Sequence, residues 1–121
     1  MGTFAADDYE SASKAALAGG TTTLIEMICP GPKDEPWEAY QLWRSQAKKK
    51  AAVDYTFHMS VVRFDNKARP QFEKIVKDGV PSFKVFLAYK GALDLSDEHL
   101  YQKLGLTCLS LTTRNLPWAK A

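Results

Sequence analysis

The chain has 121 residues, enough for one domain, and its 45% hydrophobic and 25% charged content is typical of soluble globular domains. Sixteen Lys and Arg against fourteen Asp and Glu leave a net charge of +2, too small to favour a nucleic-acid partner. No apolar run reaches the length of a membrane span, the N-terminus does not read as a signal peptide, and the two cysteines offer no disulfide framework or metal-binding spacing. We therefore expect a cytoplasmic protein with no membrane partner.

Helix-like and strand-like segments alternate in the first half of the chain. Asp7-Asp8 can cap a helix over 11–18 that ends at two glycines. The β-branched and apolar segment 21–28 predicts a strand. Pro36 fits the first turn of a helix that closes at lysines 48–50. Aromatic residues at helical spacing in this helix are expected to be core: Trp37, Tyr40 and Trp43.

The alternation continues in the second half. Residues 54–62 alternate with period two and predict a strand, 70–77 predict a helix, and 82–87 predict a further strand. Ser96, followed by two acidic residues, is a good helix start. Strands separated by helices predict an α/β fold with a parallel sheet.

The last seventeen residues differ in composition from the rest. Residues 105–121 contain no acidic side chain, and their pattern fits neither a clean helix nor a clean strand. We therefore expect one α/β unit over 1–104 and an atypical C-terminal tail over 105–121.

A cation interrupts the apolar strand at 82–87. Lys84 stands among apolar side chains, and burying an ammonium there without a partner is unfavourable. Such a lysine either has a chemical use or extends its side chain from the strand end into solvent. Tyr89 follows, and by strand parity it would face away from Lys84 unless the chain leaves the strand between them.

Several stretches, taken in order, resemble the dihydropyrimidinase and D-hydantoinase family over about residues 1–104. They are 14–22, Pro30-Gly31-Pro32, Trp43-Arg44, 54–58, 82–91, Ser96-Asp97-Glu98 and Leu100-Tyr101. The family fold is the TIM barrel of metal-dependent amidohydrolases. The resemblance implies a partial TIM barrel of three βα units, covering about strands two to four.

The resemblance also implies an activity and its site. Family members open dihydropyrimidine or hydantoin rings, as in pyrimidine degradation, with two zinc ions bridged by a carboxylated lysine. Lys84 matches that lysine, and Tyr89 matches a tyrosine that donates a hydrogen bond to the oxyanion intermediate. The other ligands, a His-x-His pair, two histidines and an aspartate, would fall before Met1 and beyond Leu104. The chain alone is therefore expected to be inactive, with Lys84 as a plain amine.

Four other polar residues have weaker claims to a place in the site. His58 lies within the strand predicted at 54–62 and lacks a second ligand at a motif spacing, which favours a packing or hydrogen-bonding role. His99 at a helix start has less claim, and Lys90 is expected in solvent. Glu26, in the strand predicted at 21–28, would need a partner if buried, and no role is assigned to it.

Two non-enzymatic hypotheses stay open. One is a scaffold like the collapsin response mediator relatives, which share the barrel but replace the lysine and tyrosine that Lys84 and Tyr89 match. The other is a partner that docks on a full-length homologue through open sheet edges. Because three βα units leave such edges and an apolar face uncovered, we expect self-association or low solubility.

Overall fold

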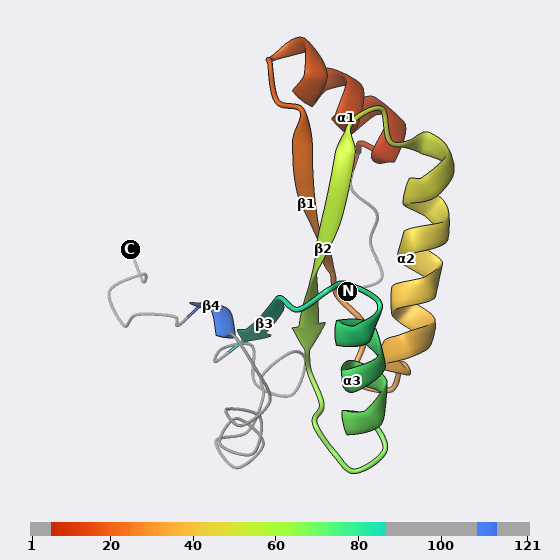
Figure 1. Ribbon diagram of the computed structural model, residues 1–121, viewed down its shortest axis with the longest axis vertical. Helices are drawn as coiled ribbons and strands as arrows, with labels where there is room; N and C mark the ends of the chain where they lie inside the picture. Colours follow the sequence, from red (N-terminus) through yellow and green to blue (C-terminus); the bar gives the residue numbers. More distant parts are fainter. Residues whose placement is uncertain (1–5, 87–108, 114–121) are drawn as a thin grey trace.

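A computed structural model describes residues 6–86 and 109–113 (Figure 1). The elements are α1 (Tyr9–Ala18), β1 (Thr23–Ile28), α2 (Pro36–Lys50), β2 (Asp54–Val61), α3 (Arg69–Lys77), β3 (Phe83–Phe86) and β4 (Leu109–Thr113). The strands form one sheet in the order β1-β2-β3-β4, and each neighbouring pair is parallel. The predicted α/β fold with parallel strands is confirmed, whereas the helix predicted from Ser96 lies outside the described residues.

Strand β4 is a difference from the sequence prediction. It lies in the segment whose pattern favoured neither helix nor strand, and it pairs parallel with β3, with a register shift between Phe83 and Val85. Pairing with a neighbouring strand can order a segment that lacks a clear pattern of its own. The segment is thus a strand although its own pattern did not predict one, and the division at residue 104 stays a prediction.

Helix α1 begins at the predicted cap. The Asp8 carboxylate accepts hydrogen bonds from the backbone N–H groups of Glu10 and Ser11, and the Ser11 hydroxyl accepts from the Asp8 N–H. Asp8 also lies 2.8 Å from the Lys50 ammonium at the end of α2. The Lys50 hydrogen bond, helped by the Ser11 N–H, lowers the pKa of Asp8 to about 2. The cap thus joins the start of α1 to the end of α2.

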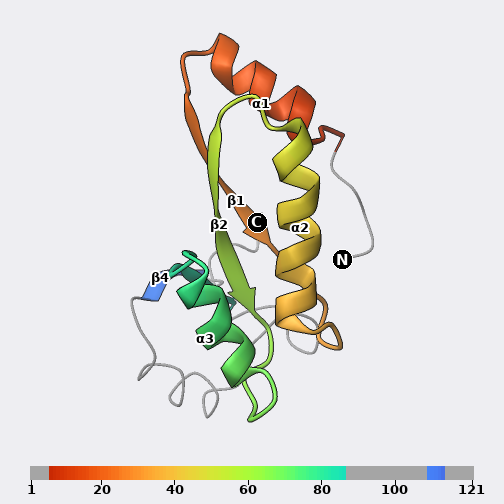
Figure 2. The same cartoon turned by 45° about the vertical axis from the view of Figure 1, so that its right-hand side comes forward.

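The hydrophobic core lies between the sheet and helices α2 and α3, which run along one side of β1 and β2 (Figures 1 and 2). Alternate strand residues turn toward these helices, as a period of two requires. The strands contribute Ile28, Phe57, Met59, Val61, Phe83 and Val85, and the helices contribute Ala39, Tyr40, Ala47, Phe72 and Ile75. The aromatic stripe of α2 is core as predicted, since Tyr40 is buried and Trp37 and Trp43 pack against the cluster.

A polar clip joins the two helices at one end of the core. The Tyr40 hydroxyl donates to the Asp78 carboxylate over 2.6 Å, and the Arg44 guanidinium pairs with the same oxygen. Burial, together with the hydrogen bond to Asp78, raises the pKa of Tyr40 to about 12.

Helix α2 has 15 residues, and within 6–86 and 109–113 no helix is long and apolar enough to cross a membrane.

Truncating the centre of this core is expected to destabilise the domain. Ile75 of α3 is 0% exposed, so Ile75→Ala should lower the free energy of unfolding by about 2–5 kcal/mol through lost burial and the cavity left behind. Leu42 of α2 is 51% exposed, so the control Leu42→Ala should change it by less than about 1 kcal/mol. Urea unfolding followed by circular dichroism measures both, and equal losses would contradict this placement of the core.

Candidate functional site

The face of the sheet that points away from the helices carries polar side chains near the carboxyl ends of the strands. Ser60 of β2 is the register partner of Lys84 of β3, and Ser60 is fully buried. On the other side of Ser60, the Cys29 thiol lies 3.3 Å from the serine hydroxyl, directly after β1 ends. Cys29, Ser60 and Lys84 therefore form one row that runs from the end of β1 across β2 to β3.

Lys84 does not lie in the hydrophobic core. Its neighbours Phe83 and Val85 turn into the core, whereas Lys84 is half-buried on the opposite face, as strand parity requires. Its ammonium nitrogen lies 4.3 Å from the centre of the Phe86 ring, two residues along the same face. This cation–π contact gives the charged side chain a partner without placing it among the apolar side chains of the core.

His58 belongs to the neighbouring row on the same face. It is the register partner of Met27, and its ring nitrogen Nδ1 lies 2.5 Å from the Ser82 hydroxyl, just before β3. A hydrogen bond of this kind fixes the orientation of the ring. The sequence prediction that His58 is a hydrogen-bonding residue is therefore consistent with the structure.

The described residues do not assemble a metal site by themselves. Within 6–86 and 109–113, no group of three or more His, Cys, Asp or Glu could hold a metal ion. Lys84 is the one predicted ligand in this range, and one side chain cannot hold two cations. Tyr89, together with Lys90 and His99, lies outside the described residues, so the geometry between Tyr89 and Lys84 is not described.

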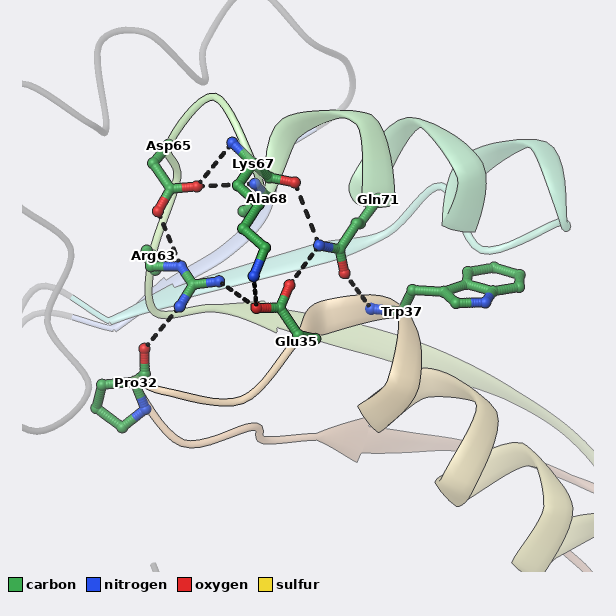
Figure 3. A network of polar contacts seen from close by, with 8 residues as sticks. All are labelled: Pro32, Glu35, Trp37, Arg63, Asp65, Lys67, Ala68 and Gln71. Carbon is green, nitrogen blue, oxygen red and sulfur yellow. Dashed lines mark hydrogen bonds and ion pairs between the residues drawn. The ribbon is translucent and has the colours of Figure 1, made fainter.

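A second polar cluster, not anticipated from the sequence, lies at the carboxyl ends of β1 and β2 and centres on Glu35 (Figure 3). The Glu35 carboxylate accepts from the Lys67 ammonium at 2.7 Å and from the Gln71 side-chain amide at 2.5 Å. The Arg63 guanidinium lies 3.5 Å away. The hydrogen bonds from Lys67 and Gln71 lower the pKa of Glu35 to about 2.

The remaining contacts of this cluster reach the surrounding backbone. Gln71 of α3 accepts a hydrogen bond from the Trp37 N–H, so it caps the first turn of α2 from another helix. Arg63 donates to the Pro32 carbonyl and lies 3.0 Å from Asp65, whose carboxylate accepts from two N–H groups in the turn before α3. The cluster thus ties the loop after β1 to the loop after β2.

The charged groups of the Glu35 cluster form ion pairs and hydrogen bonds with one another. We therefore interpret the cluster as one that holds the loops in position rather than as a ligand site. In TIM barrels, the loops at the carboxyl ends of the strands carry the catalytic residues. The sequence contains only a weak signal for the Glu35 cluster. This signal is an acidic residue directly before Pro36 and an Arg-x-Asp motif after β2. Glu35 lies 28 residues from Arg63 and 32 residues from Lys67, and only the fold brings them together.

Sequence comparison relates the chain to dihydropyrimidinases. It is 37% identical to the dihydropyrimidinase of Rattus norvegicus over 102 residues, which are 84% of this chain and 20% of that protein. It is also 37% identical to dihydropyrimidinase-related protein 5 of Mus musculus over 97 residues, 79% of this chain and 17% of that protein. The chain thus spans about a fifth of the length of these relatives. No family model matches the chain.

Structural comparison gives the same result. A D-hydantoinase from Thermus sp. superimposes with a TM-score of 0.82 and 53% sequence identity, covering 86% of this chain and 23% of that one. The parallel α/β unit is a partial, unclosed TIM barrel. With the sequence relatives, this likeness shows that the chain belongs to the dihydropyrimidinase and D-hydantoinase family, of whose members it corresponds to a segment.

The Glu35 cluster predicts a specific dependence of stability on pH. Because the pKa of Glu35 falls from 4.5 to about 2 on folding, its contribution is complete above about pH 4.5 and is lost as the pH falls toward 2. Glu35→Gln should lower the urea midpoint of unfolding at pH 7. Between pH 5 and pH 2, the midpoint of this variant should fall less steeply than that of the wild type. Urea unfolding at pH steps of about half a unit measures both. The exposed Glu38→Gln is the control, and a decline as shallow in that variant would refute the assignment.

Proposed function

We propose that this chain is the part of a dihydropyrimidinase-type cyclic-amide hydrolase that carries the lysine of its binuclear zinc site. The observation that supports this is the position of Lys84. It lies on the face of the sheet opposite the helices, in a row with Ser60 and Cys29, which are at the carboxyl ends of β2 and β1. Active sites of TIM barrels are built at that end of the strands.

In this proposal Lys84 has two states. In the 121-residue chain it is an ammonium in contact with the Phe86 ring. In a complete barrel its neutral amine would add to carbon dioxide and lose a proton, which gives a carbamate. That anion would have to leave the negative face of the ring and turn toward the cations that stabilise it.

The rest of the chemistry requires residues that other strands would supply. Two zinc ions, when bound, supply water activation and polarisation of the amide carbonyl. Tyr89 would donate a hydrogen bond to the oxyanion formed when a dihydropyrimidine or hydantoin ring is attacked. Because the chain supplies only one of the metal-binding residues, it is proposed to be inactive alone. It is proposed to be located in the cytoplasm.

A scaffold role is the second candidate, and a specific observation keeps it open. The chain is 37% identical both to a dihydropyrimidinase and to a dihydropyrimidinase-related protein, so identity alone does not separate the two. The presence of Lys84 and Tyr89 favours the hydrolase, because the resemblance implies that scaffold relatives replace both. The two hypotheses therefore differ in whether Lys84 and Tyr89 take part in catalysis.

Transplantation tests the roles of Lys84 and Tyr89. A Thermus sp. D-hydantoinase whose matched segment is replaced by this chain should open hydantoin rings. In that chimera, Lys84→Ala should lower kcat by at least roughly a hundredfold, because even outer-shell partners of a metal are worth 10–100-fold. Tyr89→Phe should lower kcat by about 10²–10³-fold with a smaller change in KM.

The nearby lysine provides the matched control for this experiment. Lys90→Ala in the same chimera should retain activity close to that of the unmutated chimera, and bound zinc should be lost only with Lys84→Ala. An active chimera that tolerates Lys84→Ala would refute the ligand role. A folded chimera without activity would favour the scaffold hypothesis instead.

The chain by itself gives a simpler expectation. Purified protein incubated with excess zinc should not open dihydrouracil above the rate of a zinc blank, measured by loss of ring absorbance. Lys84→Ala should behave identically to the wild type. Turnover that needs Lys84 would overturn the proposal that the remaining ligands must come from elsewhere.

A further inference from the structure

Arg63 connects three segments of the chain that meet near the carboxyl ends of β1 and β2 (Figure 3). One nitrogen of its guanidinium donates to the Pro32 carbonyl at 3.2 Å, in the loop after β1. A second nitrogen lies 3.5 Å from the Glu35 carboxylate, directly before α2. The third lies 3.0 Å from the Asp65 carboxylate, in the turn before α3. One side chain that is 26% exposed thus contacts two loops and the start of a helix.

The contacts of Arg63 differ from those of Lys67, the second cation of the Glu35 cluster. The Lys67 ammonium is 74% exposed and pairs with Glu35 at 2.7 Å. Because Lys67 stays beside Glu35, loss of Arg63 would leave the Glu35 charge paired, and the hydrogen bond to the Pro32 carbonyl would be lost. A planar guanidinium with five N–H donors can contact a carbonyl and two carboxylates at once, whereas an ammonium is a compact point charge.

The loop after β1 contains a compact turn. The Gly31 N–H donates to the Asp34 carboxylate at 2.8 Å, and the Asp34 N–H donates to the Gly31 carbonyl at 3.1 Å. These two hydrogen bonds fix the shape of the turn, but they do not fix its position relative to β2, because all their groups belong to the turn. Pro32 lies inside the turn, so its bond to Arg63 connects the turn to the segment that follows β2.

This loop is continuous with the row that contains Lys84. Pro32 lies three residues after Cys29, and Arg63 lies at the same interval after the serine of the row, Ser60. The bond between Arg63 and Pro32 therefore joins the same two segments as the 3.3 Å contact between the Cys29 thiol and the Ser60 hydroxyl. Ser60 is in turn the register partner of Lys84. A displaced loop is thus expected to alter the surroundings of Cys29 first.

We propose that Arg63 is a positioning residue of the hydrolase, which holds the loop after β1 in place beside the row that contains Lys84. This inference rests on the proposed function. Because its partners lie in the loops, Arg63 acts through the loop and not by contact with the substrate. Loops at the carboxyl ends of the strands form the active sites of TIM barrels, so a displaced loop weakens substrate binding. Lys84 is held by β3 itself, and KM is therefore expected to change more than kcat.

Reactivity of the Cys29 thiol in the 121-residue chain tests the position of the loop without requiring activity. The chain has two cysteines, so a Cys108→Ser parent leaves Cys29 as the one thiol. In that parent, Arg63→Met should raise the rate of reaction with an aromatic disulfide reagent by about tenfold, because a hydrogen bond from a charged donor is lost. The rate should not depend on urea well below the unfolding transition, since local opening exposes little surface.

The neighbouring arginine of α3 provides the matched control. Arg69 is 58% exposed and pairs at 3.3 Å with Glu73 of its own helix, so Arg69→Met should leave the thiol rate unchanged. Arg63→Lys keeps the charge without the planar fork and should fall between Arg63→Met and the parent. The proposal is overturned if Arg63→Met reacts no faster than the parent. It is also overturned if the faster reaction rises steeply with urea, as global unfolding requires.

Kinetics of the Thermus sp. D-hydantoinase chimera test the effect on the site. Arg63→Met should raise KM for hydantoin by about tenfold and change kcat by less than about threefold. Arg69→Met should change neither. An active chimera in which Arg63→Met leaves KM unchanged would refute the positioning role. An unmutated chimera without activity would count against the proposed function, and the thiol rates would still decide whether Arg63 holds the loop.

Discussion

The parallel register of β1, β2 and β3 is the constraint on which the rest of the molecule depends. Because side chains alternate along each strand, one register assigns every residue to the helix-covered face or to the opposite face. It buries Met59 and Val85 under α2 and α3, and it brings Ser60 beside Lys84. A shift by one residue would place the Lys84 side chain in the core and Val85 in its row.

The two polar clusters near the carboxyl ends of the strands have different characters. Around Glu35, cations and carboxylates are engaged with one another and with the loop backbone, so that cluster stabilises the positions of the loops (Figure 3). In the row that contains Lys84, the contacts are weaker: a thiol against a hydroxyl and an ammonium against a ring. Side chains held weakly are free to change partners, which suits a residue proposed to take part in chemistry.

Membership in a family does not transfer the activity of the whole protein to a segment of it. The chain corresponds to about a fifth of its sequence relatives, and its sheet is unclosed. A barrel collects its catalytic residues from many strands, whereas its packing is made mostly between neighbouring βα units. A segment can therefore retain a fold that superimposes well on a D-hydantoinase and still hold only one residue of the proposed metal site.

The amino-acid sequence by itself determined those features that depend on residues close together in the chain. Periodicity predicted the first three strands and the helices between them, and the cap at Asp8 follows from a side chain within reach of its own helix. Lys84 was also a candidate site residue because its immediate neighbours in the sequence are apolar. Its role was implied by the resemblance to the family. The predictions of the strands, the helices and the cap succeeded because their interactions are local, and the role of Lys84 stays a proposal.

Only the tertiary structure decided which distant residues meet. The Glu35 cluster, the Cys29–Ser60 contact and the pair of His58 with Ser82 join segments 24 or more residues apart. Strand β4 follows from pairing with β3 and not from its own pattern. The physical reason is common to all of them: sheet register and edge position are properties of strand pairing, which residue spacing within one segment does not specify.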